Sequence, residues 1–189
     1  AHLFAPAATY RSAARMSAGR APGPGKNYTL GPGAVATYYE KDDEYGVRRR
    51  TMLDAGANPR DGVVVTYFLK AKPEGDVTLE LLDADGEHTK TFTPKPAEEP
   101  EKPAWSLPKD PHIPIEAGAN RFVWNMRYGN ARQAEVEGAT DKGLKGPLAP
   151  PGEYQVRLTV DGRSQTQSFE LVKDPGVPAS QEDLEAQFN

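Results

Sequence analysis

The sequence predicts an all-β protein in which two antiparallel sheets pack face to face as a β-sandwich. The 189 residues include 18 glycines and 18 prolines, which disfavour long helices. Several segments alternate apolar and polar residues with the period of two that is typical of half-buried strands. Turn sequences, rather than amphipathic helices, separate these segments. A closed barrel is the alternative, because periodicity does not show whether the sheet edges meet.

The first three strands are expected between residues 63 and 93. Residues 63–69 are rich in β-branched and aromatic side chains, and residues 77–83 place Val77, Leu79 and Leu81 on one face. Gly86 supplies the positive φ of a turn, after which residues 88–93 return as an antiparallel partner. Asp83 and Asp85 give this turn the look of a calcium loop, but the later oxygen ligands of such a loop are missing. We therefore predict a plain hairpin.

Three more strands are expected in the second half of the chain. Residues 120–128 set Phe122, Trp124, Met126 and Tyr128 on one face, so these side chains are predicted to enter the core. Residues 152–160 alternate in the same way and bring Tyr154 into the core. Asp-Gly at 161–162 then predicts a tight hairpin, with the returning strand at 163–172.

The other segments divide the chain around this sandwich, which we place at residues 51–175. Residues 1–50 are predicted to be a docking segment followed by Gly/Pro-rich chain, and residues 17–35 to form an irregular loop or an extended surface segment. Residues 94–117 are a Pro-rich, acidic insertion between two strands, expected as a long loop. Residues 176–189 carry a helix start at Ser180, with Leu184 and Phe188 on one face, and this helix is expected to be cut short.

The N-terminal segment carries apolar side chains that a free tail would leave in water. Leu3, Phe4 and Tyr10 lie within the first eleven residues, and burial of such side chains is worth about 1.5–3 kcal/mol each. We expect this segment to lie against the sandwich, either as an edge strand or in a groove.

Composition and motifs exclude several classes of function. Lysine and arginine number 23 against 27 acidic residues, a net charge of −4, so we expect no nucleic-acid partner. Uninterrupted apolar runs of about five residues fall far short of the roughly 18 that span a bilayer, so no membrane span is expected. The chain has no cysteine, its three histidines are widely separated, and no nucleophile or phosphate-loop motif occurs. We expect no cofactor, no metal site, no catalytic residue and no enzymatic activity.

Aromatic residues outside the predicted strands are candidate ligand-binding residues. Trp105 lies in the Pro-rich insertion, whereas Tyr38, Tyr39 and Tyr45 lie in the polar segment before the sandwich. Rings of this kind stack on sugar rings or pack against a protein partner when they face solvent. In the alternative, the insertion folds back and Trp105 covers a sheet edge or one end of the core.

An ordered set of short motifs carries a family resemblance. It comprises Asn58-Pro59, Asp61-Gly62, residues 120–124, and Pro151-Gly152 with Tyr154. In this order the chain resembles the C-terminal region of bacterial sortilin-like or BNR-repeat glycosyl hydrolases. The resemblance implies an immunoglobulin-like or fibronectin III-like sandwich, similar to that of flagellar hook-capping proteins, which follows a β-propeller and precedes a helical tail. It also implies a secreted or periplasmic location, with the propeller of the same chain as a partner.

The shared residues are expected to determine the fold. Gly152 begins a strand. Tyr154 buries its ring while its hydroxyl hydrogen-bonds the backbone, as in a tyrosine corner. Trp124 and Phe122 fill the core, and Asn58 before Pro59 favours an extended or turn conformation. The hydrolase activity implied by the resemblance belongs to the propeller, and the Asp-box of propeller blades is missing here, so no catalytic residue is transferred.

These observations predict a non-catalytic accessory or interaction module of a larger exported protein. A carbohydrate-binding module that uses exposed aromatic rings is the alternative. A contribution to a glycoside hydrolase active site is the least favoured hypothesis, because it requires acid and base carboxylates that converge in one cleft.

Overall fold

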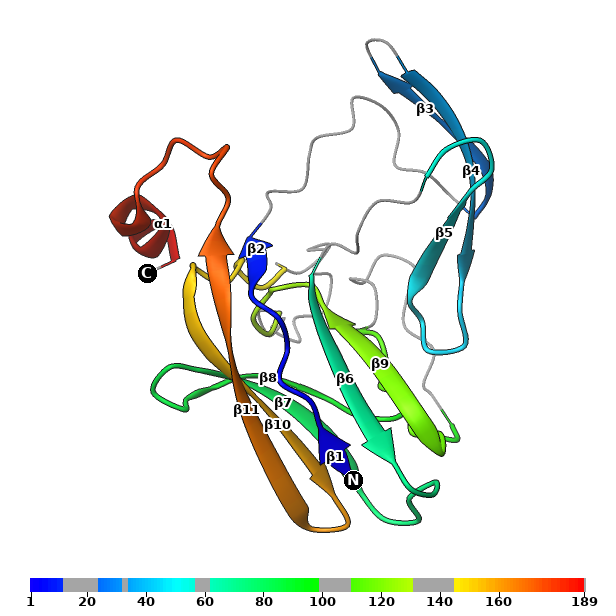
Figure 1. Ribbon diagram of the computed structural model, residues 1–189, viewed down its shortest axis with the longest axis vertical. Helices are drawn as coiled ribbons and strands as arrows, with labels where there is room; N and C mark the ends of the chain where they lie inside the picture. Colours follow the sequence, from blue (N-terminus) through cyan, green and yellow to red (C-terminus); the bar gives the residue numbers. More distant parts are fainter. Residues whose placement is uncertain (12–23, 32–33, 57–61, 99–109, 131–144, 189) are drawn as a thin grey trace, which may run out of the picture.

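A computed structural model of the chain describes residues 1–11, 24–31, 34–56, 62–98, 110–130 and 145–188. Within these residues there are eleven strands and one helix, which confirms the all-β class (Figure 1). Trp105 and Asn58 lie outside the described residues, so the predictions for these two positions stay predictions.

Two sheets form a sandwich-like body. The three-stranded sheet has the order β1-β6-β9, and its strands are β1 (His2–Leu3), β6 (Val63–Leu69) and β9 (Gly118–Trp124). The five-stranded sheet has the order β2-β11-β10-β7-β8, and its strands are β2 (Thr9–Arg11), β11 (Arg163–Lys173), β10 (Gly152–Val160), β7 (Val77–Asp83) and β8 (His88–Phe92). Neighbouring strands are antiparallel except for β2, which runs parallel to β11.

The core lies between these two sheets, because alternate side chains of both sheets point inwards. Trp124 of β9 is fully buried, and its ring centroid lies 5.8 Å from that of Tyr154 and 6.2 Å from that of Phe169. Phe122 meets Phe92 at 4.5 Å in the same way. Aromatic pairs at these separations add about 0.5–1.5 kcal/mol to the energy of burial. The predicted core positions of Trp124, Phe122 and Tyr154 are confirmed.

The two predicted hairpins are also confirmed. Asp161 and Gly162 have φ values of 50° and 74°, and positive values at both positions define the turn that matches strand twist. In the β7–β8 turn, the Asp83 carboxylate accepts hydrogen bonds from the backbone N–H groups of Asp85 and Glu87. These two hydrogen bonds stabilise the hairpin turn.

Tyr154 closes one end of the sandwich. Its ring is 3% exposed, and its hydroxyl donates to the carbonyl oxygen of Pro150 at 2.9 Å, as predicted. Gly152 begins β10 with a φ of 152°, a conformation that L side chains rarely adopt. These two residues fix how the chain enters β10.

The two buried tyrosines make the fold sensitive to alkaline pH. Burial raises the pKa of Tyr67 and of Tyr154 above the ordinary value of about 10, and each hydroxyl donates to a backbone carbonyl. Above pH 10 the unfolded chain loses these protons while the folded chain keeps them. With respect to these two groups, the free energy of unfolding is therefore expected to stay constant up to about pH 9.5. Above pH 10 it is expected to fall, by up to about 1.4 kcal/mol per pH unit for each tyrosine.

Urea unfolding between pH 9 and pH 11, with absorbance at 295 nm as the tyrosinate signal, measures this loss. Tyr67→Phe removes one ionisable group, so its stability is expected to fall less steeply with pH than that of the wild type. Equal slopes for the two proteins above pH 10 would contradict the assignment.

One predicted strand has different bounds. Residues 120–128 were expected to continue as one strand, whereas β9 covers Gly118–Trp124. Met126 has a φ of 56°, a left-handed conformation that is uncommon for non-glycine residues and that ends the strand. Met126 still reaches the core, and its carbonyl oxygen accepts a hydrogen bond from the N–H of Ala149 at 2.7 Å.

The N-terminal segment docks as an edge strand, as one of the two alternatives predicted. Residues 2 and 3 pair with β6, and Leu3 is fully buried. The expected burial of the other two apolar residues is wrong: Phe4 is 46% exposed and Tyr10 is 59% exposed. Successive side chains of a strand point to opposite faces, so Leu3 and Phe4 cannot both face the core.

A third sheet stands beside the sandwich, formed by residues that precede the predicted sandwich strands (Figure 1). This meander, as we call it, has the order β3-β4-β5 and consists of β3 (Gly25–Gly31), β4 (Ala34–Asp42) and β5 (Arg48–Met52). An irregular loop was one prediction for residues 17–35. Residues 25–31 instead take the other, extended form, as a strand hydrogen-bonded to β4.

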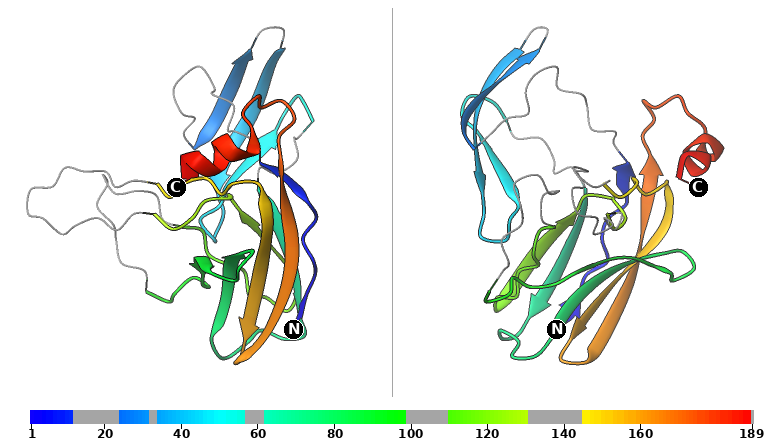
Figure 2. Two further views of the ribbon diagram at one scale, coloured as in Figure 1. Left: turned by 90° about the vertical axis from the view of Figure 1, so that its left-hand side faces the viewer. Right: turned by 180° about the vertical axis from the view of Figure 1, so that it is seen from behind.

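The remaining segments agree with the sequence. The described parts of the insertion, residues 94–98 and 110–117, are loop, and Ile113 enters the core. Helix α1 (Gln181–Phe188) starts at Ser180, whose hydroxyl accepts the N–H of Asp183 at 3.1 Å. Leu184 is buried. Figure 2 shows α1 and the meander on opposite sides of the sandwich. No described helix is long and apolar enough to cross a membrane.

Candidate functional site

The alternation of strand β4 separates two of the candidate tyrosines. Tyr38 is 3% exposed, so its predicted role as an exposed ring is wrong. Tyr39 is 48% exposed and points to the opposite face of the meander. Tyr39 therefore remains a candidate binding residue.

The face that carries Tyr38 is held together by charge pairs. Glu40 is 3% exposed, and Arg50 donates to its Oε1 from Nε at 2.9 Å and from Nη2 at 2.7 Å. The Arg50 guanidinium also lies over the Tyr38 ring, 4.1 Å from the ring centroid. Arg48 pairs with both Asp42 and Glu40. The buried Glu40 carboxylate is thus satisfied by charged donors, and loss of either arginine would leave it with fewer partners.

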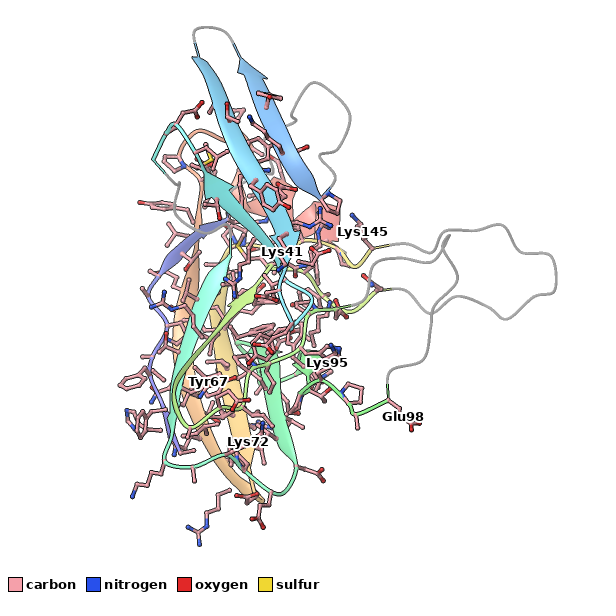
Figure 3. The ribbon with its side chains drawn as sticks, turned by 90° about the vertical axis from the view of Figure 1, so that its right-hand side faces the viewer. Lys41, Tyr67, Lys72, Lys95, Glu98 and Lys145 are labelled. Carbon is pink, nitrogen blue, oxygen red and sulfur yellow. The ribbon has the colours of Figure 1, made fainter. Side chains whose placement is uncertain are left out.

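The opposite face, which we call the tyrosine face, exposes its two tyrosines to solvent, and at its other end Arg49 lines a small hollow with Pro114 and Arg121. Its side chains are Lys26 and Tyr28 from β3, Thr37, Tyr39 and Lys41 from β4, and Arg49 and Thr51 from β5. Tyr28 is 60% exposed, and the Lys26 Nζ atom lies 5.7 Å from the centroid of its ring. Figure 3 shows Lys41 of this sheet towards the meander end, above Tyr67 and Lys72 of the sandwich.

Sequence reasoning missed Tyr28, although a signal for it existed. Lys26 and Tyr28 alternate with Asn27, and the same period of two runs through Thr37, Tyr39 and Lys41. The strand register places Lys26 opposite Tyr39 and Tyr28 opposite Thr37. The structure thus brings Tyr28 and Tyr39 together as diagonal neighbours on adjacent strands.

Tyr45 has a different role from Tyr39. It lies in the β4–β5 turn, where the Asp43 carboxylate accepts N–H bonds from Tyr45 at 3.0 Å and from Val47 at 2.9 Å. The Tyr45 carbonyl oxygen accepts the N–H of His112 at 2.8 Å, which ties the turn to the sandwich. Burial raises the pKa of the Tyr45 hydroxyl, and the ring is only partly exposed. Tyr45 therefore joins the meander to the sandwich and does not extend the tyrosine face.

A concave surface lies at the end of the sandwich and is lined in part by Lys70, Lys72 and Glu74. Lys72 pairs with Glu116 at 3.0 Å, and both side chains are more than half exposed. Exposed pairs of this kind contribute little energy. We therefore assign no binding role to this hollow. Across the described residues, no group of three or more histidine and carboxylate side chains is placed to hold a metal ion.

Comparison with known proteins gives no match. The chain matches no known protein family, no curated protein and no solved structure.

Proposed function

We propose that this chain is a non-catalytic, immunoglobulin-like accessory module of a larger exported bacterial protein that also contains a β-propeller. The strand order is the observation that supports the immunoglobulin-like part of this proposal, and the larger exported protein follows from the sequence resemblance. If β1, β6, β7, β8, β9, β10 and β11 are lettered A, B, C, C′, E, F and G, the two sheets have the orders A-B-E and G-F-C-C′. In immunoglobulin-type sandwiches A, B and E share one sheet, and C, F and G share the other.

Tyr154 adds independent support for the immunoglobulin-like assignment. It lies near the start of the strand lettered F, and its hydroxyl bonds the backbone four residues upstream, at Pro150. This is the position and the bond of a tyrosine corner. Helix α1 after the last strand also agrees with the helical tail that the resemblance implies.

The outer face of the β1-β6-β9 sheet is where we propose that the propeller packs. Phe4 is 46% exposed and Phe68 is 42% exposed, and His2 stacks edge-on against Phe4 at 4.5 Å. Phe68 pairs with His2 in the β1–β6 ladder, so these rings lie close together beside the N-terminal strand. Exposed apolar side chains that gather on one face favour contact with another domain.

Activity assays test the non-catalytic assignment. The purified chain, offered a broad panel of glycoside and peptide substrates, is expected to turn over none of them. Turnover that a single point substitution abolishes would overturn the proposal. Cell fractionation of the full-length gene product tests export, and recovery of that product in the cytoplasm alone would overturn that part.

The exposure of Tyr39 beside Tyr28 favours a second candidate function, carbohydrate recognition. Two solvent-facing rings on one sheet, with lysine and threonine side chains between them, provide apolar surface for sugar rings and polar groups for their hydroxyls. A glycan array tests this candidate. Binding that Tyr39→Ala removes supports it, and an array without signal removes it. Trp105 remains a predicted contributor.

A further inference from the structure

We propose that the tyrosine face binds an acidic polysaccharide, a chain of sugar rings that carry carboxylates. This inference rests on the carbohydrate-recognition candidate and names its ligand class. Tyr39 and Tyr28 supply the stacking surfaces. Lys26, Lys41 and Arg49 supply the charges that pair with the sugar carboxylates.

The strand register defines the layout of the face. Lys26, Tyr39 and Thr51 form one row across the three strands, because Tyr39 pairs with Lys26 on β3 and with Thr51 on β5. Tyr28 and Thr37 form the next row. Tyr28 and Tyr39 are diagonal neighbours, and such positions lie about 7–8 Å apart. Two adjacent rings on one rigid sheet can therefore contact successive sugars of one chain.

The charges of the face favour an anionic ligand. Lys41 and Arg49 lie directly opposite each other on β4 and β5, an arrangement of like charges that destabilises a sheet. Asp43 pairs with Arg49 at 2.7 Å, whereas no carboxylate of the described residues forms an ion pair with Lys41. A ligand carboxylate beside Lys41 would relieve this repulsion.

The opposite face of the same meander provides the contrast. There Arg48 pairs with Asp42 and Glu40, and Arg50 pairs with Glu40, so the charges are matched within the sheet. On the tyrosine face Asp43 pairs with Arg49, and no described ion pair involves Lys41. Asp54 accepts the N–H of Thr37 at 2.7 Å, in the row away from Lys41. Positive charge is thus in excess at the Lys41–Arg49 end.

A nucleic acid would use the same kinds of side chain, but the charges of the whole chain disfavour it. Nucleic-acid binding draws on many phosphate contacts, and this chain has a net charge of −4. The proposed contact needs only stacking on Tyr28 and Tyr39 and one carboxylate beside Lys41, and so fewer cations than a run of phosphates.

Calorimetric titration of the chain with polygalacturonate, alginate and hyaluronate tests the proposal. Fully methyl-esterified polygalacturonate is the matched neutral ligand, because it keeps the sugar backbone and loses the charge. At least one acidic glycan is expected to bind. Tyr39→Ala is expected to weaken binding about tenfold or more and Lys41→Gln about threefold to tenfold, as for stacking and charge contacts of this kind.

Matched variants separate this face from the rest of the surface. Tyr10→Ala removes a tyrosine that is 59% exposed on β2, and Lys70→Gln removes an exposed lysine of the sandwich. Both are expected to bind like the wild type. Because Tyr39 and Lys41 are exposed, their variants are expected to fold, and circular dichroism spectra that match the wild type confirm this.

The outcomes distinguish the inference from the function on which it rests. If the methyl ester binds as tightly as the acid, the preference for acidic glycans is overturned and carbohydrate recognition stands. If none of the glycans binds, or if Tyr10→Ala weakens binding as much as Tyr39→Ala, the acidic-glycan proposal and the carbohydrate-recognition candidate are both overturned. If an oligothymidylate binds more tightly than every acidic glycan, the face is a nucleic-acid surface and the proposal is overturned.

Discussion

Replacing Trp124 with alanine is expected to lower the free energy of unfolding by about 3–5 kcal/mol, the range for large-to-small substitutions of this kind in a core. The indole is fully buried, and its ring contacts Tyr154 and Phe169 of the opposing sheet. Its Nε1 atom donates to the Arg127 carbonyl oxygen at 2.9 Å. The substitution therefore removes contact between the two sheets and also leaves a carbonyl without its donor.

Urea unfolding followed by far-UV circular dichroism measures this loss and does not depend on the fluorescence of the indole that is removed. Phe68→Ala is the control, because this aromatic residue lies on β6 of the same sheet and is 42% exposed. Its expected cost is below about 1.5 kcal/mol. Equal costs for the two substitutions would contradict the placement of Trp124 between the sheets.

The sandwich could be predicted from the sequence because its strands bury one face against an apolar core. In β7 and β10 this burial produces a period of two in apolar side chains, β6 is marked by its β-branched and aromatic residues, and the turn glycines mark where the strands end. Where the backbone departs from this rule, the bounds were wrong. Met126 continues the apolar period but takes a left-handed φ, and side-chain pattern carries no information about that choice.

The meander could not be predicted in the same way, since charge pairs share its buried face with Tyr38. Glu40 has the same low exposure as Tyr38, yet a buried glutamate appears as a surface residue in a hydropathy pattern. Its partner Arg50 lies ten positions away, and only the strand register brings the two together.

The candidate site was predictable only in part for a related reason. Exposed aromatic residues were expected in the polar segment, and Tyr39 is one of them. Strand pairing and the covered face of the meander decide that Tyr28 lies beside Tyr39 on the exposed face. They also decide that Tyr38 and Tyr45 do not lie there. Neither the strand pairing nor the covered face can be read from the residues next to each tyrosine in the sequence.

Replacing Leu3 with alanine is expected to lower the free energy of unfolding by about 2–4 kcal/mol, although Leu3 is only the third residue of the sequence. Leu3 is fully buried, and the edge strand that carries it bonds both sheets. The N–H of Phe4 donates to the Thr66 carbonyl oxygen on β6. From β11, Gln165 accepts the N–H of Leu3 at 2.9 Å and Gln167 donates to the Leu3 carbonyl oxygen at 3.3 Å. Leu3 thus covers the open edge between the two sheets.

For a domain of this size each kcal/mol corresponds to about 2–4 °C, so the melting temperature of Leu3→Ala is expected to fall by on the order of 10 °C. Phe4→Ala provides the matched control, since the neighbouring side chain is 46% exposed, and a fall of no more than about 3 °C is expected. Deletion of residues 1–11 is expected to cost at least as much as Leu3→Ala, because it removes β1 and β2 together. An unchanged melting temperature after that deletion would show that the segment is a tether. Equal effects of Leu3→Ala and Phe4→Ala would show that apolar content, rather than the inward position of Leu3, holds the strand.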